Sequence, residues 1–178
     1  GGLPASVDSS KFKVGQNVAA TPGDVVFRSE QLELIQYRPQ TPGVHGTPLF
    51  IVPPQINKYY VWDLAPGRSL IEFLVQQGFE VFVVSWFNPS VAQSGWGLES
   101  YVLALEDAME VTRRITRAPQ LHVLGACSGG MTAAALLAYL VGLVAAMLVR
   151  VRSGVETALY RTGELDQRLR RMGAGRES

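Results

Sequence analysis

The sequence predicts an α/β fold in which helices cover a parallel sheet. Three short apolar runs of strand length, at residues 49–52, 81–86 and 121–124, alternate with two stretches of helical periodicity. Strands that are apolar at every position are typical of parallel sheets, because both faces of such a sheet are buried. A tight Gly-containing turn and a long apolar helix follow the third run.

Two helices are expected between these strands. The first covers residues 68–77 and ends at Gly78, a residue that suits a C-terminal cap. Its apolar side is expected to carry Leu70, Ile71, Phe73 and Leu74. The second covers residues 98–117, with Pro119 just beyond its end. Helical spacing relates its residues Leu98, Tyr101, Leu105, Met109 and Thr112.

Three regions are expected along the chain. Residues 1–47 form a lead-in rich in Gly, Pro, Ser and Thr, with short strands near residues 25–27 and 32–35. Residues 48–149 carry the sheet and the turn. Residues 150–178 form a tail with seven arginines and four acids, expected to be either a solvated helix or disordered.

Length and composition limit the class of protein. The 178 residues suffice for one domain with a core, and 47% hydrophobic content describes a globular chain. A formal net charge of +1 gives no reason to expect nucleic acid as a partner. The single cysteine excludes an internal disulfide and fits a reducing compartment. The chain starts Gly-Gly-Leu-Pro, without an initiator Met or a signal peptide, so we expect an internal fragment of a longer protein.

The turn at residues 125–129 carries the candidate chemistry. It reads Gly-Ala-Cys-Ser-Gly, with Cys127 where the nucleophile-elbow motif G-x-S-x-G has serine. Gly125 and Gly129 fit a turn so sharp that side chains two positions either side of the nucleophile would collide. The start of the following helix favours the thiolate, the form that attacks. The sequence therefore predicts a nucleophilic cysteine; a buried structural cysteine in a Gly-rich turn is the alternative.

The apolar residues 131–149 allow two interpretations. They contain no charged residue, are long enough to cross a bilayer, and are followed by Arg150 and Arg152 as a positive flank. A nucleophile turn, however, needs its helix packed on the sheet. We therefore expect a helix buried behind the turn and keep the membrane span as the alternative.

Several long motifs resemble the catalytic domain of polyhydroxyalkanoate synthases. In chain order they are PPQINKYYVWDL at residues 53–64, VFVVSWFNP at 81–89, WGLESYVLALEDAMEVT at 96–112 and LGACSGG at 124–130. Residues 11–37 resemble the segment that precedes this domain in the family. GACSGG and PPQINK look closer to the class II enzymes, which favour medium-chain monomers, than to class I. The resemblance ends abruptly near Leu140, and we attribute this, as a hypothesis, to another reading frame or a cloning sequence that follows there.

The resemblance implies an α/β-hydrolase fold, incomplete here and ending with the N-terminal part of the catalytic domain through the elbow. It implies polymerisation of (R)-3-hydroxyacyl-CoA, with medium-chain monomers, into polyester with release of coenzyme A. The growing chain would be held as a thioester on Cys127. It implies no cofactor and no metal. A cytoplasmic enzyme at the surface of polyester granules is also implied, as is a homodimer for the full-length protein.

Acyl transfer also needs backbone donors for the developing oxyanion. One is expected from the amide after the nucleophile, Ser128, whose side chain we interpret as an ordinary helix-start hydroxyl. The other is expected from the loop after the first buried strand. Pro53 and Pro54 have no N–H, so the first available donors there are Gln55 and Ile56, and the resemblance points to Ile56.

The base and its orienting acid are missing. No histidine follows Cys127, although this fold places nucleophile, acid and histidine in that chain order. His122 is expected about 16 Å from the sulfur, at a core-facing or hydrogen-bonded strand position. His45 is expected in an exposed loop. The catalytic Asp and His of the family therefore do not map onto this chain, and we expect the fragment itself to be inactive.

Two other functions fit the same residues. A thiol hydrolase or depolymerase on this fold would release free hydroxy acid instead of passing the acyl group to the next monomer. A non-catalytic membrane- or granule-associated segment would depend on the apolar residues 131–149.

Overall fold

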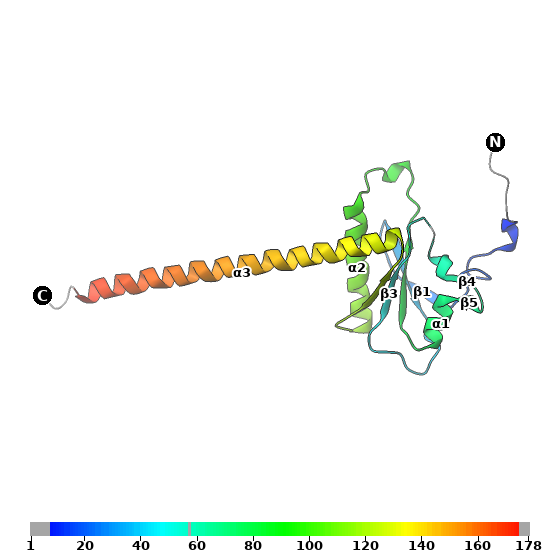
Figure 1. Ribbon diagram of the computed structural model, residues 1–178, viewed down its shortest axis with the longest axis horizontal. Coiled ribbons are helices and arrows are strands. Elements are labelled where there is room, and N and C mark those ends of the chain that lie inside the picture. Colours follow the sequence, from blue (N-terminus) through cyan, green and yellow to red (C-terminus); the bar gives the residue numbers. More distant parts are fainter. Residues whose placement is uncertain (1–7, 57, 175–178) are drawn as a thin grey trace. The chain divides into compact units, whose positions relative to one another are not determined.

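The computed structural model of the protein describes residues 8–56 and 58–174 (Figure 1). The chain divides into two compact units, Gly1–Leu136 and Leu137–Ser178. The first unit holds the sheet and the elbow, and the described residues of the second, up to Ala174, are helical. The candidate chemistry therefore lies entirely within the first unit.

The first unit contains a five-stranded sheet whose central strands are parallel. Strand β3 pairs in parallel with β6 on one side and with β7 on the other, while β1 and β2 are antiparallel additions next to β6. The order across the sheet is β1-β2-β6-β3-β7. The strands are β1 (Gly23–Arg28), β2 (Leu32–Tyr37), β3 (Leu49–Val52), β6 (Val81–Trp86) and β7 (His122–Gly125). The predicted α/β fold is confirmed, as are the residue ranges of β3 and β6.

Helices cover the two faces of this sheet. Helix α1 (Leu70–Gln76) and helix α2 (Leu98–Thr116) lie on opposite sides of it (Figure 1). Ile71 and Val75 of α1 are fully buried in one cluster with Ile51 and Val83 of the sheet. Because strand side chains alternate between faces, Phe50, Val52, Phe82 and Val84 occupy the other face, and all four are buried. Burial on both faces explains why β3 and β6 read as continuous apolar runs.

Helix α1 differs from its prediction in start and face. It begins at Leu70, because Arg68 and Ser69 form strand β5 (Arg68–Ser69) against β4 (Asp63–Ala65), and the Ser69 hydroxyl caps the helix by accepting the Glu72 N–H. The predicted face is wrong at Leu70 and Phe73, which are 37% and 55% exposed. In so short a helix the i, i+4 pair Ile71 and Val75 covers the sheet, and Gly78 follows with φ +82° as expected.

Helix α2 confirms its prediction to within one residue: it ends at Thr116, and its C-cap residue Arg117 adopts a left-handed φ of +56°. Its buried stripe consists of Val102, Ala104, Leu105, Ala108 and Thr112. Leu98, expected on this stripe, is 60% exposed because it lies at the first position of the helix, beyond the sheet. Three short 3-10 helices complete the first unit, namely η1 (Ser9–Lys11), η2 (Tyr59–Trp62) and η3 (Val91–Gln93).

The lead-in is joined to the sheet domain through strands β1 and β2 and through a buried carboxylate. Asp63 is 1% exposed, and its two oxygens accept the backbone N–H and the hydroxyl of Thr21 at 3.0 and 2.8 Å. Burial and the Asp63 charge raise the pKa of Tyr37 well above its usual range. The domain boundaries after residues 47 and 149 stay a prediction.

Helix α3 (Ser128–Ala174) begins in the first unit and continues into the second. Within the first unit Thr132, Ala133 and Leu136 are buried, as a helix behind the turn requires. Beyond Leu136 the expected burial of residues 131–149 is wrong, because in the second unit the large apolar side chains from Val141 to Val155 are exposed. In the part of the chain that the structure describes, Ser128–Ala158 is long and apolar enough to cross a membrane. The tail is helical through Ala174, which agrees with the helix expected there and not with disorder.

Candidate active site

The turn between β7 and α3 places Cys127 in a left-handed backbone conformation. Strand β7 ends at Gly125, helix α3 begins at Ser128, and Cys127 has φ +52°. L-residues rarely adopt this conformation, because the Cβ atom approaches the following carbonyl. The Gly130 N–H donates to the Ala126 carbonyl at 3.2 Å, so the turn passes directly into the helix. Cys127 is exposed, which contradicts the alternative of a buried structural cysteine.

The two glycines that flank Cys127 leave no room for a side chain. A Cβ atom at Gly125 would lie 2.6 Å from the Cα atom of Gly130. A Cβ atom at Gly129 would overlap the carbonyl oxygens of Val52 and Pro53. Here the start of α3 touches the backbone at the end of β3. The spacing of the motif therefore has a steric origin on both sides of the cysteine.

The loop after β3 is tied to the first turn of α3 by hydrogen bonds. The Gln55 N–H donates to the Ser128 hydroxyl at 3.2 Å, and the Gln55 side-chain amide donates to the Thr132 hydroxyl at 2.9 Å. The Ser128 side chain is therefore not the ordinary helix-start hydroxyl that was expected. The sequence signal that could have predicted these bonds is the pair of hydroxyl residues, Ser128 and Thr132, four positions apart at the start of an otherwise apolar helix.

The two predicted oxyanion donors lie in these same segments. The amide of Ser128 is at the first position of α3, where the helix provides no acceptor for it. The amide of Ile56 follows Gln55, whose own N–H is already bonded to Ser128. The Ile56 side chain is 87% exposed, so this residue does not owe its place to packing. The assignment of Ser128 and Ile56 to an oxyanion site stays a prediction.

A second buried contact fixes the loop to β6. The indole N–H of Trp86 donates to the Pro53 carbonyl at 2.7 Å, and the bond is buried. The Lys58 ammonium group donates to the Trp86 carbonyl at 3.3 Å, and burial lowers the pKa of Lys58. Tyr59 and Trp62 of η2 pack against the apolar cluster beneath α1. Asn57, which belongs to the same motif, lies outside the described residues.

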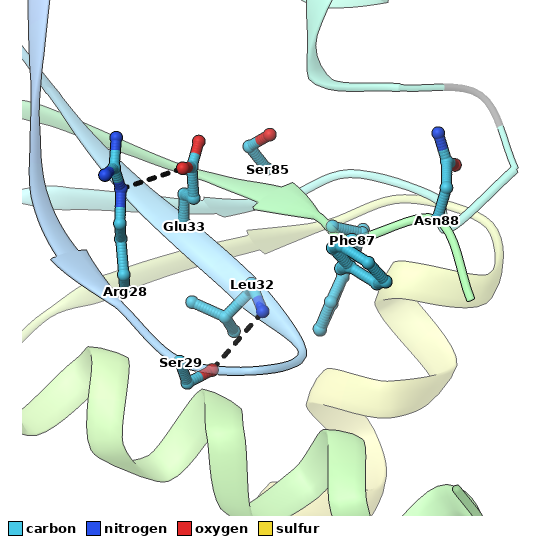
Figure 2. Close-up of a pocket in the computed structure, with 8 residues that line it drawn as sticks. Arg28, Ser29, Leu32, Glu33, Ser85, Phe87 and Asn88 are labelled. Carbon is cyan, nitrogen blue, oxygen red and sulfur yellow. Dashed lines mark hydrogen bonds and ion pairs between the residues drawn. The ribbon is translucent and has the colours of Figure 1, made fainter. Parts of the chain in front are cut away.

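A hollow of about 430 Å³ opens beside this loop, where the β1–β2 turn meets the end of β6 (Figure 2). Arg28 and Glu33 form an ion pair of 2.8 Å on one side of it, and Phe87 lies across from them. Trp86 also lines the hollow and connects it to Pro53. Because β3 and β6 are parallel, the hollow and the loop after β3 lie at the same edge of the sheet.

Both histidines of the chain are exposed. His122 is exposed on β7, so the core-facing position predicted for it is wrong. Its strand is the last of the sheet and has only β3 as a neighbour within the described residues. His45 is exposed in its loop, as predicted, and one ring nitrogen lies 3.1 Å from the Gln77 carbonyl. Among the described residues no group of three or more His, Cys, Asp or Glu side chains is placed to hold a metal ion.

Comparison with known proteins adds to this geometry. Residues 2–74 match the family model described as the N-terminus of poly-beta-hydroxybutyrate polymerase (PhaC), and residues 44–154 match the α/β-hydrolase fold. Poly(3-hydroxyalkanoate) polymerases 2 and 1 of Ectopseudomonas oleovorans are 50% and 47% identical over 139 residues. The polymerase subunit PhaC of Cupriavidus necator is 46% identical over 140 residues.

These alignments cover 78% of the chain in each case. They cover 25%, 25% and 24% of the relatives, so the chain spans about a quarter of the length of the curated relatives it matches. The family models, the relatives and the strand–elbow–helix geometry agree. The chain belongs to the α/β-hydrolase fold and, within it, is a partial chain of the polyhydroxyalkanoate synthase family.

Proposed function

We propose that this chain carries the nucleophile of an acyltransferase that builds polyester from (R)-3-hydroxyacyl-CoA. The observation that carries the proposal is the exposed Cys127, held at φ +52° between a strand and a helix. Such a position leaves the sulfur open to a substrate, with the start of a helix beside it. The relatives named poly(3-hydroxyalkanoate) polymerase support the choice of acyl donor and product.

In the proposed reaction the Cys127 thiolate attacks the thioester carbonyl of the hydroxyacyl-CoA. A carbon–sulfur bond to Cys127 forms, and the oxyanion accepts hydrogen bonds from the amides of Ser128 and Ile56. Collapse of this intermediate breaks the bond to coenzyme A, whose thiolate leaves and takes up a proton. The hydroxyl of the next hydroxyacyl-CoA then loses its proton to a base and attacks the enzyme thioester. An ester bond forms, the bond to the Cys127 sulfur breaks, and the thiolate is regenerated, while the lengthened chain is carried as a coenzyme A thioester that can reload Cys127.

Transfer of the acyl group from one thioester to another changes the free energy little. This suits a cysteine that must later pass the acyl group on. The second step needs a base for the attacking hydroxyl, and no histidine follows Cys127 in this sequence. We therefore propose that this chain accepts one acyl group and does not sustain turnover. For the longer protein we propose a homodimer in the cytoplasm at the surface of polyester granules, on the basis of its family alone.

Acyl loading of Cys127 tests the proposal. The chain is incubated with 3-hydroxydecanoyl-CoA or 3-hydroxybutyryl-CoA, and intact mass and released coenzyme A are measured. One acyl group per chain, removable by hydroxylamine and lost in Cys127→Ala, is expected. Preference for the C10 donor would support medium-chain monomers. Free hydroxy acid would indicate hydrolysis, and sustained release of coenzyme A would contradict the proposed single loading.

The apolar part of α3 favours a second candidate, a membrane-attached segment without catalysis. Its support is the stretch Ser128–Ala158, whose length and hydropathy fit a bilayer. Retention of the chain in the membrane fraction after an alkaline carbonate wash would favour this candidate. Sedimentation alone would not separate it from association with polyester granules.

A further inference from the structure

We propose that Gln55, Ser128 and Thr132 form a polar latch that positions the Ile56 amide for the reaction at Cys127. The inference rests on the proposed function, since an oxyanion exists only if Cys127 accepts an acyl group. The three residues join the loop after β3 to the first turn of α3, across 73 and 77 positions of sequence. The three side chains touch neither the sulfur nor the substrate carbonyl in this scheme, so they act by positioning, while the backbone amide of Ser128 is itself a proposed oxyanion donor.

Each of the two hydroxyl oxygens of the latch accepts one hydrogen bond from Gln55. The Thr132 hydroxyl donates to the Ser128 carbonyl at 3.0 Å, so its oxygen is free to accept from the Gln55 side-chain amide at 2.9 Å. The Ser128 hydroxyl in turn accepts the Gln55 backbone N–H at 3.2 Å. One glutamine is thus held at both its backbone and its side chain by one helical turn.

Burial makes the latch selective for this geometry. Thr132 is 3% exposed, and the remaining side-chain oxygen of Gln55 is buried with no partner among the described residues. A buried polar atom destabilises the protein unless it is bonded, so alternative placements of the loop would leave more such atoms unpaired. The latch therefore favours this position of the loop over other positions that it could adopt.

The latch also decides which amide of the loop remains available. Pro53 and Pro54 have no N–H, and the Gln55 N–H is bonded to Ser128. The next amide along the chain is that of Ile56. Since Ser128 supplies both the latch oxygen and the first oxyanion amide, the same residue sets the spacing between the two predicted donors.

Two reactions of the same sulfur separate positioning from general structure. Acylation of Cys127 by 3-hydroxydecanoyl-CoA passes through an oxyanion, whereas alkylation by iodoacetamide displaces iodide and forms none. Both reactions depend on access to the thiolate. The ratio of the acylation rate to the alkylation rate, each followed by intact mass, therefore reports the oxyanion donors and not the general condition of the turn.

We expect Ser128→Ala and Thr132→Val to lower this ratio about 10-fold, a part of the loss seen when an oxyanion donor is removed outright. The conservative variants Ser128→Thr and Thr132→Ser should restore it to within about twofold of the original ratio. The matched control is Thr112→Val, which removes a buried hydroxyl bonded to the carbonyl four residues earlier, away from the elbow. It should leave the ratio unchanged.

The outcomes separate a failure of the latch proposal from a failure of the proposed function. An original chain that is alkylated but accepts no acyl group would overturn the proposed function and the latch together. An original chain that is acylated, with the same ratio in Ser128→Ala and Thr132→Val, would overturn the latch alone. An equal fall in Thr112→Val would also overturn it, because the effect would then be one of general stability.

Discussion

The indole nitrogen of Trp86 lies 2.7 Å from the carbonyl oxygen of Pro53, in a buried hydrogen bond between the ends of two neighbouring parallel strands. The same carbonyl faces Gly129, where even a Cβ atom would overlap it. The Pro53 carbonyl is therefore held from the side of β6 while α3 packs against it. The loop that precedes Gln55 owes its place to these two contacts.

Trp86→Phe should destabilise the first unit by about 2 kcal/mol, because it leaves the buried Pro53 carbonyl without its donor and removes packed atoms. The measurement is the midpoint of urea unfolding followed by circular dichroism. Trp96→Phe is the control, since Trp96 is half-buried and packs against Phe87 and Tyr101 through ring contacts. Equal destabilisation by both variants would mean that the hydrogen bond contributes nothing beyond ring size.

Gly129→Ala should destabilise the fold by more than about 2 kcal/mol, because the new methyl group meets backbone atoms that cannot rotate away. Gly142→Ala is the contrasting variant, since a Cβ atom there meets nothing within 4 Å and the residue lies inside α3. It should instead stabilise the helix by about 1 kcal/mol. Thermal unfolding of the two variants measures the difference, and a Gly129→Ala chain as stable as the original would refute the close contact with β3.

Glu80→Gln should raise the free energy of unfolding at pH 7 and have no effect near pH 3. Partial burial raises the pKa of Glu80 in the folded chain, and the Gln36 amide, which donates to Glu80 at 3.0 Å, only partly offsets this. A carboxyl whose pKa is raised on folding favours the native state most below its unfolded pKa. That contribution is lost as the pH rises through the folded value.

The neutral amide of the Gln variant avoids this loss and can still accept the Gln36 bond. Because Glu80 is partly exposed, solvent screening limits the gain to a few tenths of a kcal/mol. Urea unfolding at pH 3 and pH 7 measures it, with the exposed Glu30→Gln as the control. A gain that is larger at pH 3 than at pH 7 would have the wrong sign for this explanation.

Asp63→Ala should loosen the segment before β1 from the rest of the first unit. The substitution removes both acceptors of Thr21 and leaves the Thr21 N–H unpaired in a half-buried position, at a loss of about 2 to 3 kcal/mol. Limited proteolysis should then cut before β1 faster than in the original chain. Asp107→Ala, on the exposed side of α2, should leave the cleavage rate unchanged, and similar cleavage in both variants would count against the anchoring role.

Local sequence patterns determined a large part of this fold. The runs that become β3 and β6 are apolar at nearly every position, β3 is ended by Pro53, and the bounds predicted for both strands agree with the structure. The elbow could also be predicted, because the Gly-x-Cys-x-Gly spacing stands between a strand-like apolar run and a long apolar helix. The buried face of α1 could not be predicted in this way, since its two turns carry apolar residues on more than one side.

Only the tertiary structure decided how these pieces meet. An apolar run predicts that a strand is buried but not which strand lies beside it. The position of β6 between β2 and β3 could therefore not be predicted from local sequence. The same holds for the exposure of Cys127 and His122, and for the bonds from Gln55 to Ser128 and Thr132. Hydrogen bonds between residues more than 70 positions apart depend on the packed backbone, which brings their atoms within about 3 Å.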